Sequence, residues 1–149
     1  MNLKTFLSVL LVYRSNFHVL HWMVKGKNFF TLHGKADEYA GEILKDVDVI
    51  AEMHLRFEDS VVNYEEALKI IESDEKHEFL LIESNKLFDT EDFCKYTVKM
   101  FNDILTCIEE LLDTDVIQDP KNVGIKASLE GMHDKYDLQL RYLVRRFAD

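Results

Sequence analysis

Apolar residues recur every three or four positions along four stretches of the chain, which is the spacing of a helix with one buried face. The stretches cover residues 3–25, 32–58, 90–113 and 120–147. Boundary signals accompany them: Lys25-Gly26 follows the first, Asp89 opens the third as a side-chain cap, and Asp119-Pro120 opens the fourth. The pattern therefore predicts four long helices.

Only one connection between these helices is long, over residues 59–89 between the second and the third. Within it the run Asn63-Tyr64-Glu65-Glu66 reads as another helix cap and predicts a short helix over 64–73. Four long helices with one long crossover form the ferritin-like arrangement. We therefore expect an all-α, ferritin-like four-helix bundle. No repeat or linker divides the chain, so residues 1–149 are predicted to form one domain.

Composition narrows the class of protein. Hydrophobic residues make up 47% of the 149, which excludes a disordered acidic chain, and the net charge of -10 argues against coating DNA or an anionic membrane. The longest apolar run, residues 6–13, is too short to cross a bilayer. The two cysteines, Cys94 and Cys107, are too few and too isolated for a disulfide framework. We expect a reduced, cytoplasmic protein without a membrane segment.

Histidines and acids gather between residues 18 and 54, where four of the six histidines lie. On the second helix His33 and Asp37 are four residues apart, as are Asp48 and Glu52, so each pair faces one way. His21 lies one turn before the end of the first helix, and a short turn over 26–31 returns the chain toward His33. The hairpin is therefore expected to bring His21, His33 and Asp37 together.

The two pairs on the second helix cannot bind one ion within one chain. His33 and Asp48 are 15 residues apart, about 22 Å at ~1.5 Å per residue. Either there are two weak half-sites, or a second subunit packs antiparallel and brings its Asp48 and Glu52 to the histidines, twice over about a twofold axis. Imidazole and carboxylate with open positions suit Fe(II). The alternative without metal is a solvated acidic face and a hydrogen-bonded core histidine beside Trp22.

Residues 17–52 carry a composite motif, FHVLHWMVKGKNFFTLH followed by DVDVIAE. It resembles the Dps family of mini-ferritins (DNA-binding proteins of starved cells). In that family a histidine-tryptophan pair closes the first helix, and here the pair is His21-Trp22. A V-K-G turn, an F-x-x-L-H element and a D-x-x-A-E motif follow, with the same intervals as here between the candidate ligands.

The resemblance implies a ferroxidase centre, mono-iron or di-iron, shared across a twofold interface of a hollow shell of twelve identical subunits. His21, His33 and Asp37 would come from one subunit, and Asp48 and Glu52 from its partner. By the same implication the protein is an enzyme that oxidises Fe(II), typically with hydrogen peroxide, and stores the ferric product. That activity protects a cell from oxidative damage.

The chain also departs from the family pattern. Met53 stands where the family usually has arginine, and the usual glycine and proline after the second helix are absent. No Lys/Arg-rich tail precedes the first helix, so DNA binding, which commonly uses such tails in this family, is not expected here. The rival of another class is a non-catalytic Dps-like shell or a DNA-compacting protein with the same fold.

Other candidate residues receive structural interpretations. Glu130 and His133 have the E-x-x-H spacing of di-iron bundles but lack a second copy, and we interpret them as surface residues. His18 is interpreted as structural, His54 should point away from the ligand face, and Trp22 is expected to pack rather than to transfer electrons. Three further acids are interpreted as loop residues, with a pore lining as the alternative: Asp113, Asp115 and Asp119.

Overall fold

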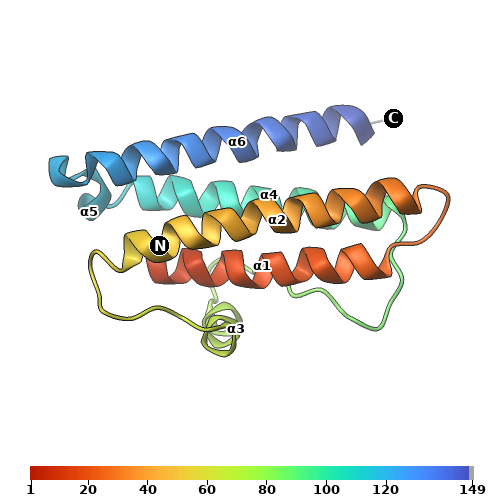
Figure 1. The fold of residues 1–149 in the computed structure, drawn as a ribbon, viewed down its shortest axis with the longest axis horizontal. Helices are drawn as coiled ribbons and strands as arrows, with labels where there is room; N and C mark the ends of the chain where they lie inside the picture. The colour runs from red at the N-terminus through yellow and green to blue at the C-terminus, as the bar shows by residue number, and fades with distance from the viewer. Residues whose placement is uncertain (148–149) are drawn as a thin grey trace.

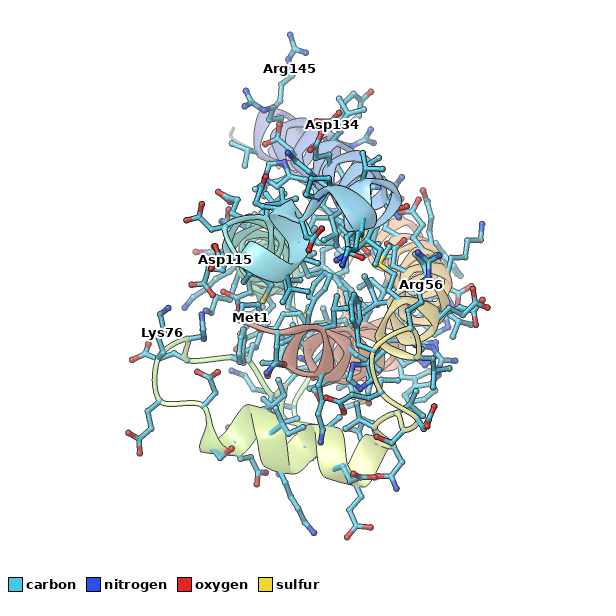
Figure 2. All side chains as sticks on the ribbon, turned by 90° about the vertical axis from the view of Figure 1, so that its left-hand side faces the viewer. Met1, Arg56, Lys76, Asp115, Asp134 and Arg145 are labelled. Atoms are coloured by element: carbon cyan, nitrogen blue, oxygen red, sulfur yellow. The ribbon has the colours of Figure 1, made fainter. Side chains whose placement is uncertain are left out.

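The computed structural model describes residues 1–147, which fold into four long helices and three short ones. The long helices are α1 (Leu3–Met23), α2 (Phe29–His54), α4 (Thr90–Leu112) and α6 (Val123–Phe147). The short ones are α3 (Tyr64–Ser73), α5 (Asp115–Gln118) and the 3-10 helix η1 (Pro120–Asn122). The four long helices lie side by side as a bundle, and α3 lies across the outside of α1 (Figures 1 and 2). The predicted ferritin-like bundle with a crossover helix is confirmed.

The helix ends show which sequence signals decide a boundary. Asn63 and Asp89 each form a full capping box, and α3 and α4 begin at the expected residues. By contrast, α2 begins at Phe29, about three residues earlier than predicted, without a side-chain cap. The fourth predicted helix is correct from residue 123, but Asp119 caps a turn of 3-10 helix before it.

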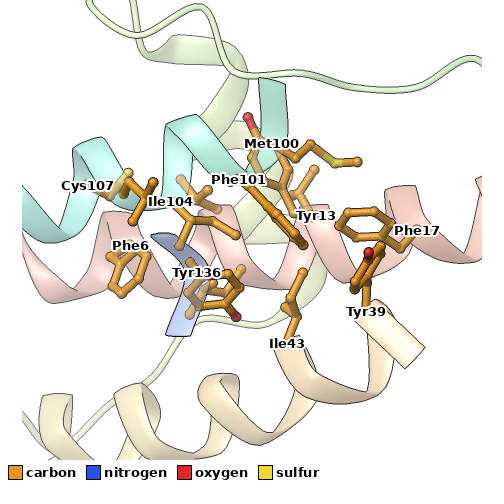
Figure 3. Close-up of a cluster of buried hydrophobic side chains, with 14 of the residues drawn as sticks. Phe6, Tyr13, Phe17, Tyr39, Ile43, Met100, Phe101, Ile104, Cys107 and Tyr136 are labelled. Carbon is orange, nitrogen blue, oxygen red and sulfur yellow. The ribbon is translucent and has the colours of Figure 1, made fainter. Parts of the chain in front are cut away.

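The interior of the bundle is filled with apolar and aromatic side chains from all four long helices (Figure 3). Phe101 of α4 lies at its centre, with ring centroids 5.8 Å from Phe17, 5.1 Å from Tyr39 and 5.5 Å from Tyr136. Close packing of this kind leaves no room at the bundle axis for an ion and its ligands.

Two buried tyrosines satisfy their hydroxyls with carboxylates. Tyr13 donates to Asp103 at 2.5 Å, and Tyr136 donates to Asp46 at 2.5 Å. Asp46, only 6% exposed, also accepts from Lys135 at 2.6 Å. Burial, together with the neighbouring carboxylate, raises the pKa of both phenols well above the usual value. The tyrosine hydroxyls and the carboxylates at these two places in the interior therefore satisfy one another through hydrogen bonds.

The crossover is fastened to the bundle by polar contacts along its length. The Asn16 amide donates to the carbonyl of Leu80, and its oxygen accepts from the N–H of Ile82. Farther on, the Phe88 N–H donates to the carbonyl of Met23, and the Lys25 N–H donates to the carbonyl of Phe88. The crossover thus ends against the turn that joins α1 to α2.

No helix within residues 1–147 is long and apolar enough to cross a membrane. Both cysteines lie on α4 as free thiols, Cys107 buried and Cys94 partly buried. Burial raises the pKa of each thiol, and neither lies at the surface as a reactive thiolate.

Candidate metal centre

His21, near the end of α1, and His33, in the first turns of α2, lie against each other across the hairpin. Their rings stack with centroids 3.7 Å apart and planes 14° apart. The Nδ1 atom of His21 is 2.6 Å from the carbonyl oxygen of His33, and Nδ1 of His33 is 2.6 Å from the carbonyl oxygen of His21. The two helices are therefore joined by a reciprocal pair of side-chain to backbone hydrogen bonds.

These bonds decide which nitrogen of each ring is available. A carbonyl oxygen can only accept, so Nδ1 must carry the proton in both rings. In the neutral imidazole Nε2 then holds the lone pair that a metal requires. Histidines that bind metals commonly have their other nitrogen fixed by a carbonyl or carboxylate in this way. The pair fits the chemistry of an Fe(II) ligand set, and the fit follows from the hydrogen bonds rather than from proximity alone.

The surroundings of the pair are partly ordered by the same hairpin. The ring of Phe29 stacks on His33, with centroids 5.1 Å apart. Asp37 lies one turn after His33 on α2 with its side chain exposed, and among the described residues it makes no hydrogen bond to either histidine. The structure thus brings His21 and His33 together and leaves Asp37 beside them.

Asp48 and Glu52 lie far from the histidines, toward the other end of α2, and both are exposed. The helix is continuous from Phe29 to His54, so the separation expected from the sequence holds. Within the part of the chain that the structure describes, no group of three or more His, Cys, Asp or Glu side chains could bind a metal ion. One chain therefore carries its candidate ligands in two separate groups, at opposite ends of one helix.

The face of α1 and α2 that carries these residues is also rich in exposed apolar side chains. Trp22 is 65% exposed, Phe30 85% and Leu44 45%. Among the aromatic pairs of the described residues, the Trp22 ring lies next to His18 alone, with centroids 5.6 Å apart. The expectation that Trp22 packs is therefore not met within this chain. Exposed apolar side chains that gather on one face are typical of a surface that another protein covers.

The remaining candidates lie elsewhere. Glu130 is exposed, and His133 Nε2 lies 3.6 Å from a Glu109 carboxylate oxygen, so the E-x-x-H pair stays at the surface. His54 is buried with Nε2 3.6 Å from Glu58. Asp113 ends α4, Asp115 begins α5 and Asp119 caps η1.

One cluster escaped the sequence analysis because its members are far apart in the chain. His77, in the crossover, is bonded through Nδ1 to Asp74 at 3.0 Å and through Nε2 to Glu110 of α4 at 2.8 Å. The carboxylates lie on opposite sides of the ring, so the cluster fastens the crossover and does not form an ion site. The spacing of Asp74 and His77 was the only signal for it.

Comparison with known proteins agrees with this geometry. The family model of the ferritin-like domain matches residues 2–120. The "DNA protection during starvation protein" of Listeria innocua is 42% identical over 41 residues, which are 28% of this chain and 26% of that protein. The match thus spans about a quarter of the length of this curated relative.

Solved structures extend the likeness to nearly the whole chain. Dps from Staphylococcus aureus superposes with a TM-score of 0.80 at 23% identity, covering 97% of this chain and 91% of that one. The Dps protein from Vibrio cholerae, described as a member of a superfamily of ferritin-like diiron-carboxylate proteins, gives 0.78 at 20% identity, over 95% and 83%. At these identities the likeness establishes the fold.

The chain therefore belongs to the ferritin-like domain family. Within that family the proteins it resembles are Dps proteins, and the resemblance first indicated by residues 17–52 is confirmed.

Proposed function

We propose that this protein is a Dps-like ferroxidase, which oxidises Fe(II) with hydrogen peroxide at sites shared between two subunits and stores the ferric product inside a homo-oligomeric shell of twelve chains. The observation that carries the proposal is the clamped pair of His21 and His33, with both Nε2 atoms left for a metal. The assignment of Asp37, Asp48 and Glu52 as the remaining ligands is part of the proposal.

The numbering of α2 supports a shared site. The point midway between His33 and Glu52 is also midway between Asp37 and Asp48, and it falls between residues 42 and 43. Two copies of α2 packed antiparallel about a twofold axis at that point would align each histidine end with the carboxylate end of the other copy. Both partial sets would be completed at once, and two equivalent centres would form.

The residues nearest this axis suit a close contact. Gly41 and Leu44 are also symmetric about the point between residues 42 and 43. A Cβ atom added to Gly41 would meet no heavy atom within 4 Å, so there is open space over it. Leu44, 45% exposed, provides an apolar side chain of the size to fill that space from the opposite helix.

The proposed roles follow from the donor types. Neutral imidazoles and ionised carboxylates would hold Fe(II) while leaving positions open for the oxidant, so binding weakens as acid protonates them. Two Fe(II) ions supply one electron each to one peroxide, which with two protons becomes two water molecules, and hydroxyl radical is not released. The net charge of -10 favours accumulation of cations around such a protein.

The direct test is to load the metal-free protein with Fe(II) without oxygen, add hydrogen peroxide, and follow ferric absorbance. We expect rapid oxidation to a soluble product in the wild type and a rate near that of buffer in Asp48→Asn. Glu130→Gln is the matched control, an exposed acid on α6, and it should retain the wild-type rate. If Glu130→Gln abolishes oxidation and Asp48→Asn does not, a site within one chain replaces the shared one.

Mixing two inactive variants tests the sharing. His33→Ala and Asp48→Ala chains, co-assembled from the unfolded state, should recover part of the activity because one of the two centres in a mixed dimer keeps every ligand. Each variant assembled alone serves as the control. Soluble assemblies of wild-type protein without oxidation above buffer would favour the non-catalytic shell.

A further inference from the structure

A cleft of about 300 Å³ opens at the end of the bundle where α2 and α4 end and α1 begins. Figure 2 faces this end of the molecule. His54, the last residue of α2, and Glu58, one turn further on, line one side of the cleft, and residues of α1, α4 and α5 line the rest. The cleft lies at the opposite end of α2 from His33, and nothing in the proposed iron chemistry uses it.

His54 brings a ring nitrogen without a partner to this cleft. Its side chain is only 6% exposed, and its Nε2 atom is buried with no hydrogen-bond partner among the described residues. Buried polar side-chain atoms nearly always have such a partner. Nε2 faces the carboxylate of Glu58, whose nearer oxygen is 3.6 Å away. The missing partner is therefore expected in the gap between this nitrogen and this oxygen.

The gap is too long for the hydrogen bond that an ion pair would form. A charge-assisted N–H···O bond is about 2.7–2.9 Å long. The Glu58 side chain is 58% exposed and makes no other ion pair in the part of the chain that the structure describes, so little prevents it from closing on a protonated ring. If Nε2 instead holds the lone pair, two acceptors face each other, and a cation between them satisfies both.

The gap has the length that two bonds to one small metal ion span. Zinc binds an imidazole nitrogen at about 2.0–2.1 Å and a carboxylate oxygen at about 2.0–2.2 Å. Two such bonds hold their donor atoms about 3.4 Å apart at a tetrahedral angle, and about 3.0 Å apart at a right angle. The observed 3.6 Å is nearer to the tetrahedral value. An imidazole donor also favours zinc over magnesium or calcium, which take oxygen ligands.

The surroundings of the gap favour positive charge. The carbonyl ends of α2 and α4 lie at this end of the bundle, and such ends carry partial negative charge. Carboxylates follow both helices, namely Glu58 after α2, and Asp113 and Asp115 after α4. The positive end of α1 is capped by the Asn2 side chain. Lys4 is the only lysine or arginine among the described residues that line the cleft, and its exposed side chain can keep the ammonium in water.

We propose that Nε2 of His54 and the carboxylate of Glu58 bind one zinc ion per chain, with water molecules completing the coordination. The cleft has room for this water, because each molecule needs about 30 Å³. Zinc sites in proteins commonly have three or four protein ligands, so an ion with two should exchange with the solution. The bound ion would fasten the start of the crossover to the end of α2. The inference does not rest on iron oxidation or on a second subunit.

Zinc-soaked crystals of the wild-type protein test the site directly, because anomalous scattering at the zinc edge locates the ion. We expect a peak about 2.0–2.2 Å from both Nε2 of His54 and a carboxylate oxygen of Glu58. Zinc bound by the paired histidines, His21 and His33, would give a separate peak toward the other end of α2. The iron proposal and the present one are therefore judged by different peaks.

Variants test the ligands in solution by equilibrium dialysis against zinc. Glu58→Gln removes one ligand at an exposed position, so the fold should be kept. The affinity of this site should fall at least about tenfold, since loss of a residue that only supports a metal ligand already costs about 10–100-fold. Asp59→Asn, at the exposed acid next in the chain, is the matched control and should bind zinc as the wild type does. His54→Gln should match Glu58→Gln, with circular dichroism to check that the helices are intact.

Three outcomes would contradict the inference. Zinc at His21 and His33 with none between His54 and Glu58 would show that the latter two form only an ion pair, and it would leave the iron proposal intact. Equal zinc binding by the wild type and Glu58→Gln would show that this carboxylate is not a ligand. Equal losses in Glu58→Gln and Asp59→Asn would show that negative charge in general, rather than coordination, attracts the ion.

Discussion

The interior of the bundle and the outer face of α1 and α2 use polar residues in opposite ways. In the interior, Asp46 and Asp103 accept hydrogen bonds from the hydroxyls of Tyr136 and Tyr13. The space between the four long helices is packed with aromatic rings. On the outer face, His21 and His33 orient each other and leave Nε2 unused. The polar groups of the interior are satisfied within one chain, whereas the two histidines of the outer face each keep one ring nitrogen without a partner among the described residues.

This difference means that the bundle fold and the candidate metal site depend on different residues. Di-iron proteins of the bundle class place their ligands in the centre, on facing helices. Here Phe101 and its aromatic neighbours occupy that centre. The fold alone therefore does not determine where a metal site lies, and the candidate site must be inferred from its own residues.

The largest expected effect lies in the interior. Phe101→Ala removes a ring that is 0% exposed and should lower the free energy of unfolding by about 3–5 kcal/mol. Guanidinium unfolding at equilibrium measures the loss. At temperatures where the variant is folded, the proposed iron oxidation should proceed at the wild-type rate, and a loss of oxidation there would mean that the interior takes part in the chemistry.

The next effect concerns the outer face alone. Gly41→Trp adds a ring where the chain has open space, so the chain should fold normally. In the proposed dimer the ring would separate the two copies of α2, and a misplacement of ligands by 1 Å can cost roughly 100-fold in rate. Light scattering and peroxide-driven oxidation measure assembly and activity. Gly124→Trp, at another open helical position, is the control, and equal behaviour of the two variants would contradict the proposed contact.

A smaller effect involves the crossover cluster and depends on pH. Burial acts to raise the pKa of Asp74 and Glu110, but the hydrogen bonds and positive charge of His77 outweigh it and leave both pKa values lowered. Depressed carboxyl pKa values stabilise the fold above the unfolded-state values of 3.8 and 4.5, and this stability is lost as the pH falls through the folded values.

His77→Gln should therefore cost about 1.5–3 kcal/mol at pH 7 and less at pH 3, which lies below the unfolded-state values of both carboxyls. Urea unfolding at the two pH values makes the comparison, with His133→Gln, a partly buried histidine on α6, as the control. A cost that does not change between pH 7 and pH 3 would show that packing of the His77 ring on Phe79, not its charge, provides the stability.

The smallest expected effect on the isolated chain is that of Trp22→Ala. Because Trp22 is 65% exposed, its loss should change the unfolding free energy of a dissociated chain by no more than about 0.5 kcal/mol. The same variant should lower the stability of the assembled protein if a second copy covers the ring. Thermal unfolding at low and high protein concentration separates these cases, and equal shifts at both would place Trp22 outside the interface.

The sequence was sufficient for the fold because its signals are local. Apolar periodicity and the capping residues Asn63 and Asp89 act within a few positions, and these helices begin as predicted. The start of α2 was missed because its N-cap residue, Asn28, makes no side-chain cap hydrogen bond and so gives no local signal at Phe29. In the same way, Asp119 signalled a cap correctly, but the local preference for a 3-10 turn was not visible.

The candidate site was predictable in part for a related reason. His21 and His33 are joined by a short turn, so their approach could be inferred from spacing, whereas their reciprocal hydrogen bonds to carbonyls needed coordinates. The His77 cluster was missed because its members are brought together only by tertiary packing, since Glu110 lies 33 residues away from His77.

The division of ligands along α2 has a consequence for the life of the protein before assembly. If iron oxidation needs the histidine end of α2 in one chain and the carboxylate end of α2 in another, a newly synthesised chain cannot oxidise Fe(II) until it has formed a dimer. Below the dissociation constant of the dimer, the oxidation rate should then rise with the square of the chain concentration. The chemistry would begin only when a compartment for its insoluble product is being built.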